Sequence, residues 1–224
     1  SWSLLGARLD GAGSGSEYGK SVSLSSDGTS LAVGASRYNN NYTGYVEVYQ
    51  YNGSSWSLLG VRLDGASTSK FGYSVSLSSD GTILAVGAYK AASFTGYVKV
   101  YQYNGTAWTQ LGSSSPLNGD NAGDYFGKSV SLSSDGTILA VGAFGATIDG
   151  NSFTGYVEVY QYSGSLWAPL GITLNGVNAN NYFGTSVSLS SDGTILAVGA
   201  YRATIGGNAD TGYVKIYQYN GSSW

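Results

Sequence analysis

Paired carboxylates are the residues of this chain that could do chemistry, because a glycosidase needs two of them facing each other across a sugar. Asp120 and Asp124 lie close together in one polar loop, but loops often carry such pairs for solubility. The chain has no histidine and no cysteine, so the usual general bases and thiol nucleophiles are missing. We therefore predict no catalytic residues and a protein that is not an enzyme.

Four further aspartates recur in the same setting, Ser-Ser-Asp-Gly-Thr. They are Asp27, Asp80, Asp135 and Asp192. Calcium takes six to eight oxygen ligands, several of them from carboxylates, and each stretch offers a single carboxylate. Asp-Gly between two apolar runs is instead typical of a tight hairpin, and we expect a type I′ turn. The sequence therefore predicts no metal site and no cofactor.

Aromatic side chains are better candidates for recognition than the carboxylates. Most of the 20 tyrosines recur at equivalent strand positions, which indicates packing. Aromatic residues in the variable loops differ, because binding groups favour loops on a rigid scaffold. We expect ligand contacts at Tyr38, Tyr42, Tyr89, Phe144 and Tyr201.

Four asparagines lie in Asn-x-Ser/Thr sequences and are predicted glycosylation sites. They are Asn41, Asn52, Asn104 and Asn220. Three of them occupy the same Asn-Gly turn, and Asn-Gly also forms such turns without any sugar. The sequence leaves both interpretations open.

These candidates are carried by a repeated stretch of fifteen residues, SVSLSSDGTILAVGA. It occupies residues 74–88, recurs unchanged at 129–143 and 186–200, and recurs at 21–35 with Ser30 in place of isoleucine. Its first half alternates polar and apolar residues, which predicts a strand, and its second half is a continuous apolar run, which predicts a buried strand. Each copy is therefore expected to be an antiparallel hairpin.

A third strand and a Trp-x-x-Leu-Gly strand complete each repeat, which measures 52 to 59 residues from tryptophan to tryptophan. Four antiparallel strands in a repeat of this kind are typical of a propeller blade. We predict an all-β fold, a β-propeller of four four-stranded antiparallel blades in a single domain over residues 1–224. The expected repeats are approximately 10–63, 64–115, 116–174 and 175–224.

The ends of the sequence bear on how the ring closes. A propeller leaves no open strand edge, because open edges invite association. We expect the tryptophan strand 1–9 to pair with 212–219, which completes the last blade and closes the ring. The alternative is a piece of a longer array or of a larger ring, since Ser223-Trp224 repeats Ser1-Trp2.

Composition excludes several other classes of function. The net charge is −3 and charged residues make up 10% of the chain, so no basic surface for nucleic acid is expected. No run of 18 apolar residues is present, which argues against insertion into a membrane.

The pattern resembles the FG-GAP repeat, the blade unit of the integrin α-subunit propeller. The resemblance rests on Phe71-Gly72, on the stretch 74–88 and on Gly96 to Tyr101, and it extends over all four repeats. It implies an extracellular or cell-surface module that binds or scaffolds. Many such blades carry a calcium loop with several aspartates between their first two strands. Here that loop has one carboxylate, so calcium is not carried over.

Two hypotheses for function remain. The first is an extracellular structural or adhesive propeller, a unit of a longer array or filament, whose partners are other protein subunits or glycans at the cell surface. The second is a carbohydrate-binding, lectin-like propeller that uses the loop aromatics.

Overall fold

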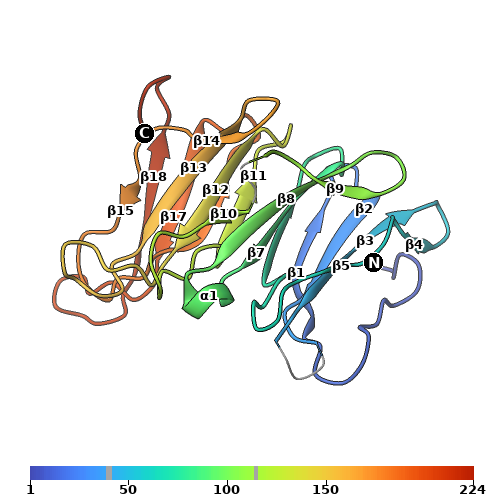
Figure 1. Cartoon of the computed structure of the whole chain (residues 1–224), viewed down its shortest axis with the longest axis horizontal. Helices are drawn as coiled ribbons and strands as arrows, with labels where there is room; N and C mark the ends of the chain where they lie inside the picture. Colours follow the sequence, from blue (N-terminus) through green and yellow to red (C-terminus); the bar gives the residue numbers. More distant parts are fainter. Residues whose placement is uncertain (39–41, 114–115) are drawn as a thin grey trace.

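The computed structural model describes residues 1–38, 42–113 and 116–224, and in it four antiparallel sheets follow one another along the chain (Figure 1). The predicted all-β fold with one antiparallel blade per repeat is confirmed. The chain passes through the sheets in sequence order, as the colours from blue to red show.

The first sheet contains β1 (Tyr18–Leu24), β2 (Ser30–Ala35), β3 (Tyr45–Tyr51), β4 (Trp56–Leu58) and β5 (Leu63–Asp64). The second contains β6 (Ser74–Leu77), β7 (Ile83–Ala88), β8 (Tyr97–Tyr103), β9 (Trp108–Gln110) and β10 (Leu117–Asn118), with the short α1 (Ala91–Phe94) between β7 and β8. The third contains β11 (Ser129–Leu132), β12 (Ile138–Ala143), β13 (Tyr156–Tyr162), β14 (Trp167–Pro169) and β15 (Leu174–Asn175). The fourth contains β16 (Phe183–Leu189), β17 (Ile195–Ala200) and β18 (Tyr213–Gln218).

Strands within a sheet pair in chain order, and the outermost strand of the first three sheets is broken into two short pieces. In the first sheet, β4 and β5 both pair with β3. The glycine that ends Trp-x-x-Leu-Gly interrupts this strand, because Gly60 adopts a left-handed φ of +77°. The first strands of successive sheets lie side by side, β1 by β6, β6 by β11 and β11 by β16.

The hairpin turn between the first two strands differs from the predicted type I′ turn. Type I′ requires positive φ at both central residues. In this turn Gly81 has φ +72°, while Asp80 is not among the residues with positive φ. The Gly81 N–H donates to the Ser78 carbonyl at 3.0 Å, and the Asp80 carboxylate accepts from the Ser78 hydroxyl and the Thr82 N–H. These side-chain hydrogen bonds stabilise a loop that is wider than a two-residue hairpin and is built on a type I turn. The predicted type I′ turn is therefore wrong.

The hairpin carboxylates make stability depend on pH. Hydrogen bonds from the Ser190 hydroxyl and from the Thr194 backbone and side chain lower the pKa of Asp192. At Asp135, burial alone would raise the pKa, but equivalent bonds from Ser133 and Thr137 outweigh it and lower the pKa. A carboxyl whose folded pKa lies below its unfolded value stabilises the fold above the unfolded pKa, and this stabilisation is lost as pH falls through the folded pKa.

We therefore expect the free energy of unfolding to fall as the pH is lowered below about 4. In urea titrations at several pH values, Asp135→Asn should be less stable than the parent at pH 7. The difference between the two proteins should shrink as the pH falls further, because the parent carboxyl then becomes protonated as well. A difference that does not change with pH would show that the charge of Asp135 is irrelevant to the turn.

The core lies at the boundaries between successive sheets. Each boundary is centred on one buried phenylalanine. These are Phe71, Phe126 and Phe183, each 0% exposed. Valines of the preceding sheet pack against this phenylalanine. Val46 and Val48 of the first sheet, for example, share one core cluster with Phe71 of the second. The predicted burial of the second strands is confirmed, since Leu84, Ala85, Val86 and Ala88 are all 0% exposed.

Tryptophan side chains link each sheet to the preceding one through backbone carbonyls. The Trp108 indole N–H donates to the Leu59 carbonyl at 2.9 Å, and the Trp224 indole N–H donates to the Leu170 carbonyl at 2.8 Å. The Trp56 indole N–H donates to the Leu5 carbonyl at 2.9 Å. The segment 1–9 is therefore held at the first sheet.

The ring closure predicted from the sequence is not observed. Among the described residues, β18 pairs only with β17, and the two termini lie at opposite ends of the row of sheets (Figure 1). Val22 of β1 is 63% exposed and Val214 of β18 is 67% exposed, although a closed ring would bury both. The contact between Leu5 and Trp56 explains the difference, because it fixes 1–9 far from β18.

Candidate functional site

Left-handed backbone positions recur in the loops at one end of the sheets. The residue before each aromatic-Gly pair adopts φ between +54° and +58°. These residues are Glu17, Lys70, Tyr125 and Tyr182. The residue before each Thr-Gly pair does the same with φ between +50° and +68°. These are Tyr42, Phe94, Phe153 and Asp210. Such conformations are costly for residues other than glycine, and they cluster at sites of function.

The two kinds of left-handed residue meet between neighbouring sheets. The Tyr125 N–H donates to the Phe94 carbonyl at 2.8 Å, and the Tyr182 N–H donates to the Phe153 carbonyl at 3.0 Å. Their rings face each other at centroid distances of 5.0 Å and 5.2 Å. The backbone conformation therefore sets two aromatic side chains against each other across the second and third boundaries.

A continuous aromatic row crosses three sheets on this loop face. It consists of Tyr73, Tyr89, Tyr125, Phe144, Tyr182 and Tyr201. Successive ring centroids are 4.5 to 5.8 Å apart, within the range in which aromatic rings attract each other. Two steps cross a sheet boundary, from Tyr89 to Tyr125 at 5.8 Å and from Phe144 to Tyr182 at 5.4 Å.

Cationic side chains lie over the aromatic row. The Lys128 ammonium is 4.1 Å from the Tyr73 ring and 4.6 Å from the Tyr89 ring, and it donates to the Tyr73 hydroxyl at 2.7 Å. Burial alone would raise the pKa of Tyr73, but Lys128 outweighs it and lowers the pKa. The Arg202 guanidinium lies 5.2 Å from the Tyr182 ring. The face therefore combines flat apolar rings with positive charge.

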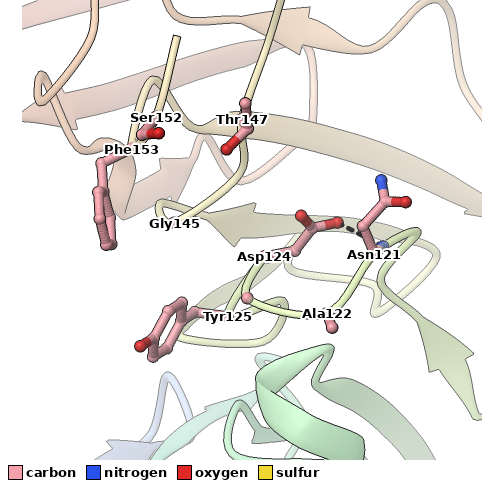
Figure 2. A pocket seen from close by; sticks show the side chains of 9 residues that line it. Asn121, Ala122, Asp124, Tyr125, Gly145, Thr147, Ser152 and Phe153 are labelled. Atoms are coloured by element: carbon pink, nitrogen blue, oxygen red, sulfur yellow. Dashed lines mark hydrogen bonds between the residues drawn. The ribbon is translucent and has the colours of Figure 1, made fainter. Parts of the chain in front are cut away.

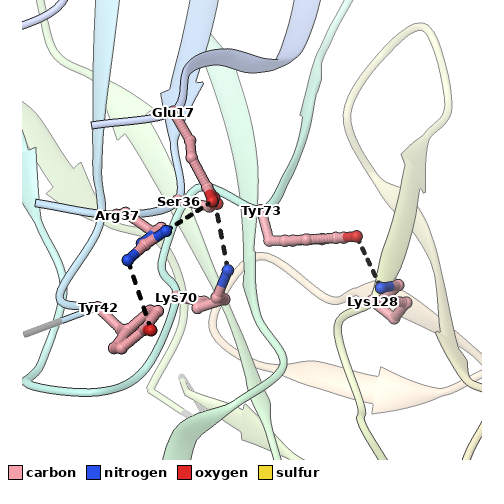
Figure 3. Close-up of polar contacts among 7 residues, drawn as sticks. All are labelled: Glu17, Ser36, Arg37, Tyr42, Lys70, Tyr73 and Lys128. Atoms are coloured by element: carbon pink, nitrogen blue, oxygen red, sulfur yellow. Dashed lines mark hydrogen bonds and ion pairs between the residues drawn. The ribbon is translucent and has the colours of Figure 1, made fainter. Parts of the chain in front are cut away.

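At the first sheet an ionic cluster takes the place of the aromatic row (Figure 3). The Glu17 carboxylate accepts from the Ser36 hydroxyl and pairs with Lys70 at 3.4 Å and Arg37 at 3.6 Å. Partial burial would raise the pKa of Glu17, but Ser36, Lys70 and Arg37 together lower it. The Arg37 guanidinium also donates to the Tyr42 hydroxyl at 3.4 Å.

A pocket of about 450 Å³ opens beside the row in the third sheet (Figure 2). The rings of Tyr125 and Phe153 stand on one side of it, and Asp124 and Asn121 on the other. Thr147 and Ser152 add hydroxyl groups to the lining. The pocket has the size of a small-molecule site, and it combines two aromatic rings with several polar groups.

Asp124 holds the pocket loop together. Its side chain is 2% exposed and accepts from the Asn121 N–H at 2.8 Å and from the Tyr156 hydroxyl at 3.3 Å. Burial raises the pKa of Asp124 above its ordinary value. The equivalent residues of the other repeats are also buried and polar, namely Ser16, Ser69 and Asn181. A buried polar residue at this position is therefore common to all four repeats.

A protein-family model matches three stretches of this chain. The model of the FG-GAP repeat matches residues 61–101, 108–160 and 171–217, which together exceed half of the chain. The chain belongs to the FG-GAP repeat family. FG-GAP repeats are typical of extracellular or surface proteins, and no helix of the described residues is long and apolar enough to span a membrane.

Solved structures show the same fold at low sequence identity. A putative 6-phosphogluconolactonase from Bacteroides uniformis matches with a TM-score of 0.59 at 11% identity, over 90% of this chain and 50% of that one. Hydrazine synthase of Kuenenia stuttgartiensis matches with a TM-score of 0.55 at 15% identity, over 89% of this chain and 58% of that one. TolB of Acinetobacter baumannii matches with a TM-score of 0.52 at 14% identity, over 89% of this chain and 40% of that one. The FG-GAP chain thus spans about half the length of these structures. No curated protein matches.

The structure brings together three of the five predicted contact residues. Tyr89, Phe144 and Tyr201 lie in the aromatic row. Tyr38 instead packs on Tyr45, and Tyr42 lies in the ionic cluster. Sequence reasoning missed Tyr73, Tyr125 and Tyr182. The signal for the last two was available, since each directly precedes the Phe-Gly pair of its FG-GAP repeat.

The predicted glycosylation sites lie mostly on exposed turns. Asn52, Asn104 and Asn220 are exposed, and each side-chain oxygen accepts N–H groups from the two following turn residues, as at Ser54 and Ser55. This bonding explains asparagine as a turn former, and glycosylation stays a prediction. Asn41 lies outside the described residues.

Removal of divalent cations is expected to leave the fold unchanged. No group of three or more metal-ligating side chains occurs among residues 1–38, 42–113 and 116–224. The hairpin carboxylates already accept hydrogen bonds from their own turns. Thermal unfolding with excess EDTA should therefore give the same midpoint as without it. A lower midpoint that calcium restores would contradict this prediction.

Proposed function

We propose that this FG-GAP repeat chain is an extracellular structural and adhesive β-propeller module that acts by binding and not by catalysis. The observation that carries the proposal is the aromatic row with its cations. A row of rings that crosses three sheets offers an extended contact surface, and rigid aromatic anchors dominate the binding energy of many interfaces. Its partners would be other protein subunits or glycans at the cell surface.

The use of the carboxylates supports a non-catalytic role. Asp27, Asp80, Asp135 and Asp192 accept hydrogen bonds inside their own hairpins. Asp124 supports a loop from a buried position. Glu17 is neutralised by two cations. Each of these groups has a structural task that explains its presence.

Changes in the aromatic row are expected to weaken adhesion. Tyr182→Ala should reduce binding of the purified chain to cell-surface material by roughly tenfold or more, because a central ring is removed from the contact surface. Tyr162→Ala is the control, since that ring packs on Trp167 at the β13–β14 hairpin, outside the row. Surface plasmon resonance would compare the two variants with the parent. Equal binding by all three proteins would reject the loop face as the adhesive surface.

Carbohydrate binding is the second candidate, and the pocket beside Tyr125 favours it. A sugar ring could stack on Tyr125 or Phe153 while its hydroxyls bond to Asn121, Thr147 or Ser152. A glycan array probed with the parent and with Phe153→Ala would test this candidate. Binding of a defined sugar that Phe153→Ala abolishes would favour a lectin, whereas an array without signal would reject it.

A further inference from the structure

The three internal boundaries between sheets are built from the same two half-interfaces. The leading half, from the earlier sheet, presents one alanine and two apolar β-branched residues. These are Ala32, Val46 and Val48, then Ala85, Val98 and Val100, then Ala140, Val157 and Val159. The following half presents the aromatic-Gly pair and the first strand, with Val75 and Leu77 as an example. Each half is buried wherever the other lies on it.

The two terminal sheets expose the same halves to solvent. In the fourth sheet Val214 is 67% and Ile216 is 73% exposed, whereas the equivalent Val157 and Val159 are 0% and 4% exposed. In the first sheet Val22 is 63% and Leu24 is 56% exposed, although the equivalents of the second sheet, Val75 and Leu77, are 9% and 7% exposed. Among the described residues, the first sheet thus has a following half without a partner and the fourth sheet a leading half without a partner.

Polar groups complete the match between the two ends. At the internal boundaries a serine hydroxyl donates to a glycine carbonyl of the next sheet, as Ser129 does to Gly184 at 2.8 Å. A second serine hydroxyl accepts a leucine N–H, as Ser131 does from Leu189 at 3.0 Å. The fourth sheet presents the equivalent Ser186 and Ser188 with no following sheet among the described residues. The first sheet presents the equivalent Gly19 and Leu24.

The backbone edge of β18 has a complement as well. In the first three sheets the third strand pairs with a Trp-x-x-Leu-Gly strand, as β13 does with β14, whereas the described residues leave the outer edge of β18 open. Trp224 already fills the tryptophan position of this motif beside Tyr219, with a centroid distance of 5.3 Å, so what β18 lacks is the part of the strand after the tryptophan. The segment 2–6 carries the same motif, Trp-Ser-Leu-Leu-Gly, and its residues after Trp2 supply that part. It lies along an apolar groove of about 650 Å³, whose lining includes Leu5, Leu9, Val22 and Leu24.

We propose that a second copy of this chain docks head to tail, with β18 and its exposed face inserted in the groove between the partner copy's segment 3–10 and β1. Segment 3–10 then adds to the edge of β18, in the mode by which strands extend open sheets. The inference rests on the structural part of the proposed function and names its partner. It does not depend on any ligand of the aromatic row.

The contact joins two different surfaces, so it forms a ring if the rotation closes and a filament if it does not. Two copies would supply eight sheets, which is within the four to eight blades typical of propellers. One like-charged pair approaches in this arrangement, Asp210 and the partner copy's Glu17. Each already has a cation of its own, with Arg202 at 3.0 Å from Asp210 and Lys70 at 3.4 Å from Glu17.

Sedimentation velocity over a range of concentrations tests the proposal with two surface variants. Ile216→Lys places a charge on the exposed face of the fourth sheet, and Leu24→Lys places a charge on the exposed face of the first sheet. Both side chains are exposed in the monomer. Each variant alone should be monomeric, with association weakened roughly tenfold or more. An equimolar mixture should form one-to-one complexes, because each variant retains the half that the other has lost. Ile172→Lys is the matched control, since Ile172 is also 73% exposed but lies outside both faces.

Every outcome of this experiment decides the proposal. A parent chain that remains monomeric would overturn it, as would dimers of a single variant, because those would require contact between two like ends. Loss of association in the Ile172→Lys control would also overturn it. Sedimentation measures head-to-tail association, whereas surface binding of the Tyr182→Ala variant measures the adhesive function of the aromatic row. A negative result for one is therefore distinguishable from a negative result for the other.

Cysteine cross-linking tests the register of the added strand. The pairs Gln102 with Thr109 and Gln161 with Ala168 predict that Gln218 faces the partner's Ser3. The chain has no cysteine of its own, so Ser3→Cys with Gln218→Cys should give disulfide-linked oligomers on mild oxidation. Ser3→Cys with Gln161→Cys is the control, because β14 already covers that edge. Equal cross-linking of the two variants would contradict the register.

Discussion

Replacing Phe126 by alanine is expected to lower the free energy of unfolding by about 3–5 kcal/mol, the range for removing a large buried aromatic side chain. Phe126 is 0% exposed and lies between the second and third sheets. Its ring is 6.4 Å from Tyr156 and 6.5 Å from Tyr160, and it shares one core cluster with Val98 and Val100 of the preceding sheet. The cavity would thus open at a boundary that holds two halves of the molecule together.

The matched control is Tyr18→Ala at the equivalent position of the first sheet. Tyr18 packs on Tyr45 within its own sheet at 6.1 Å, but it is only half-buried and no other sheet of the described residues covers it. We expect a loss of about 1–2 kcal/mol for this variant. Urea unfolding followed by tryptophan fluorescence would measure both. Equal losses would mean that contacts within a sheet, and not contacts between sheets, carry the stability.

The strands were predictable from the sequence because local pattern and local structure agree. The alternating half of 74–88 became β6, and its apolar half became the buried β7. The type of the turn between them was not predictable in the same way. The Asp-Gly pair alone predicts a two-residue turn, whereas the structure forms a loop of five residues, 78–82. The Ser78 hydroxyl bonds both to Asp80 and to the Ile83 N–H, so side chains set the loop length.

The aromatic row could be predicted only in part, because it depends on how repeats stack. Tyr89 and Phe144 were recognisable as loop aromatics. Tyr125 and Tyr182 stand at a recognisable position before the Phe-Gly pair. Their place in the row depends on left-handed backbone and on contacts from another sheet, which the sequence pattern does not show. Ring closure could not be predicted from the sequence either, because it depends on the rotation from one sheet to the next. The hydrogen bond from Trp56 to Leu5 holds segment 1–9 at the first sheet and not at β18.

Gly142→Ala is expected to lower the free energy of unfolding by about 2–3 kcal/mol, the cost of forcing atoms into a well-packed interface. A β-carbon at Gly142 would overlap the carbonyl oxygen of Gly184 in the next sheet. That oxygen also accepts the Ser129 hydroxyl at 2.8 Å, so the methyl group would disturb a hydrogen bond between sheets as well. Backbone atoms cannot move aside as the end of a flexible side chain can, so we expect the two sheets to separate locally.

Gly199→Ala separates this clash from the loss of glycine itself. Gly199 is equivalent to Gly142, but a β-carbon there would meet only the Ser186 hydroxyl of its own strand pair, and the next atoms are 3.7 Å away or more. We expect the unfolding free energy to change by less than about 1 kcal/mol, because a free serine hydroxyl can rotate away. Head-to-tail association of the same variant should be lost, since the partner's Gly19 carbonyl would occupy that space. Thermal unfolding at low concentration and sedimentation at high concentration measure the two effects. A Gly199→Ala chain that is as unstable as Gly142→Ala, or that still associates, would contradict the inter-sheet origin of both effects.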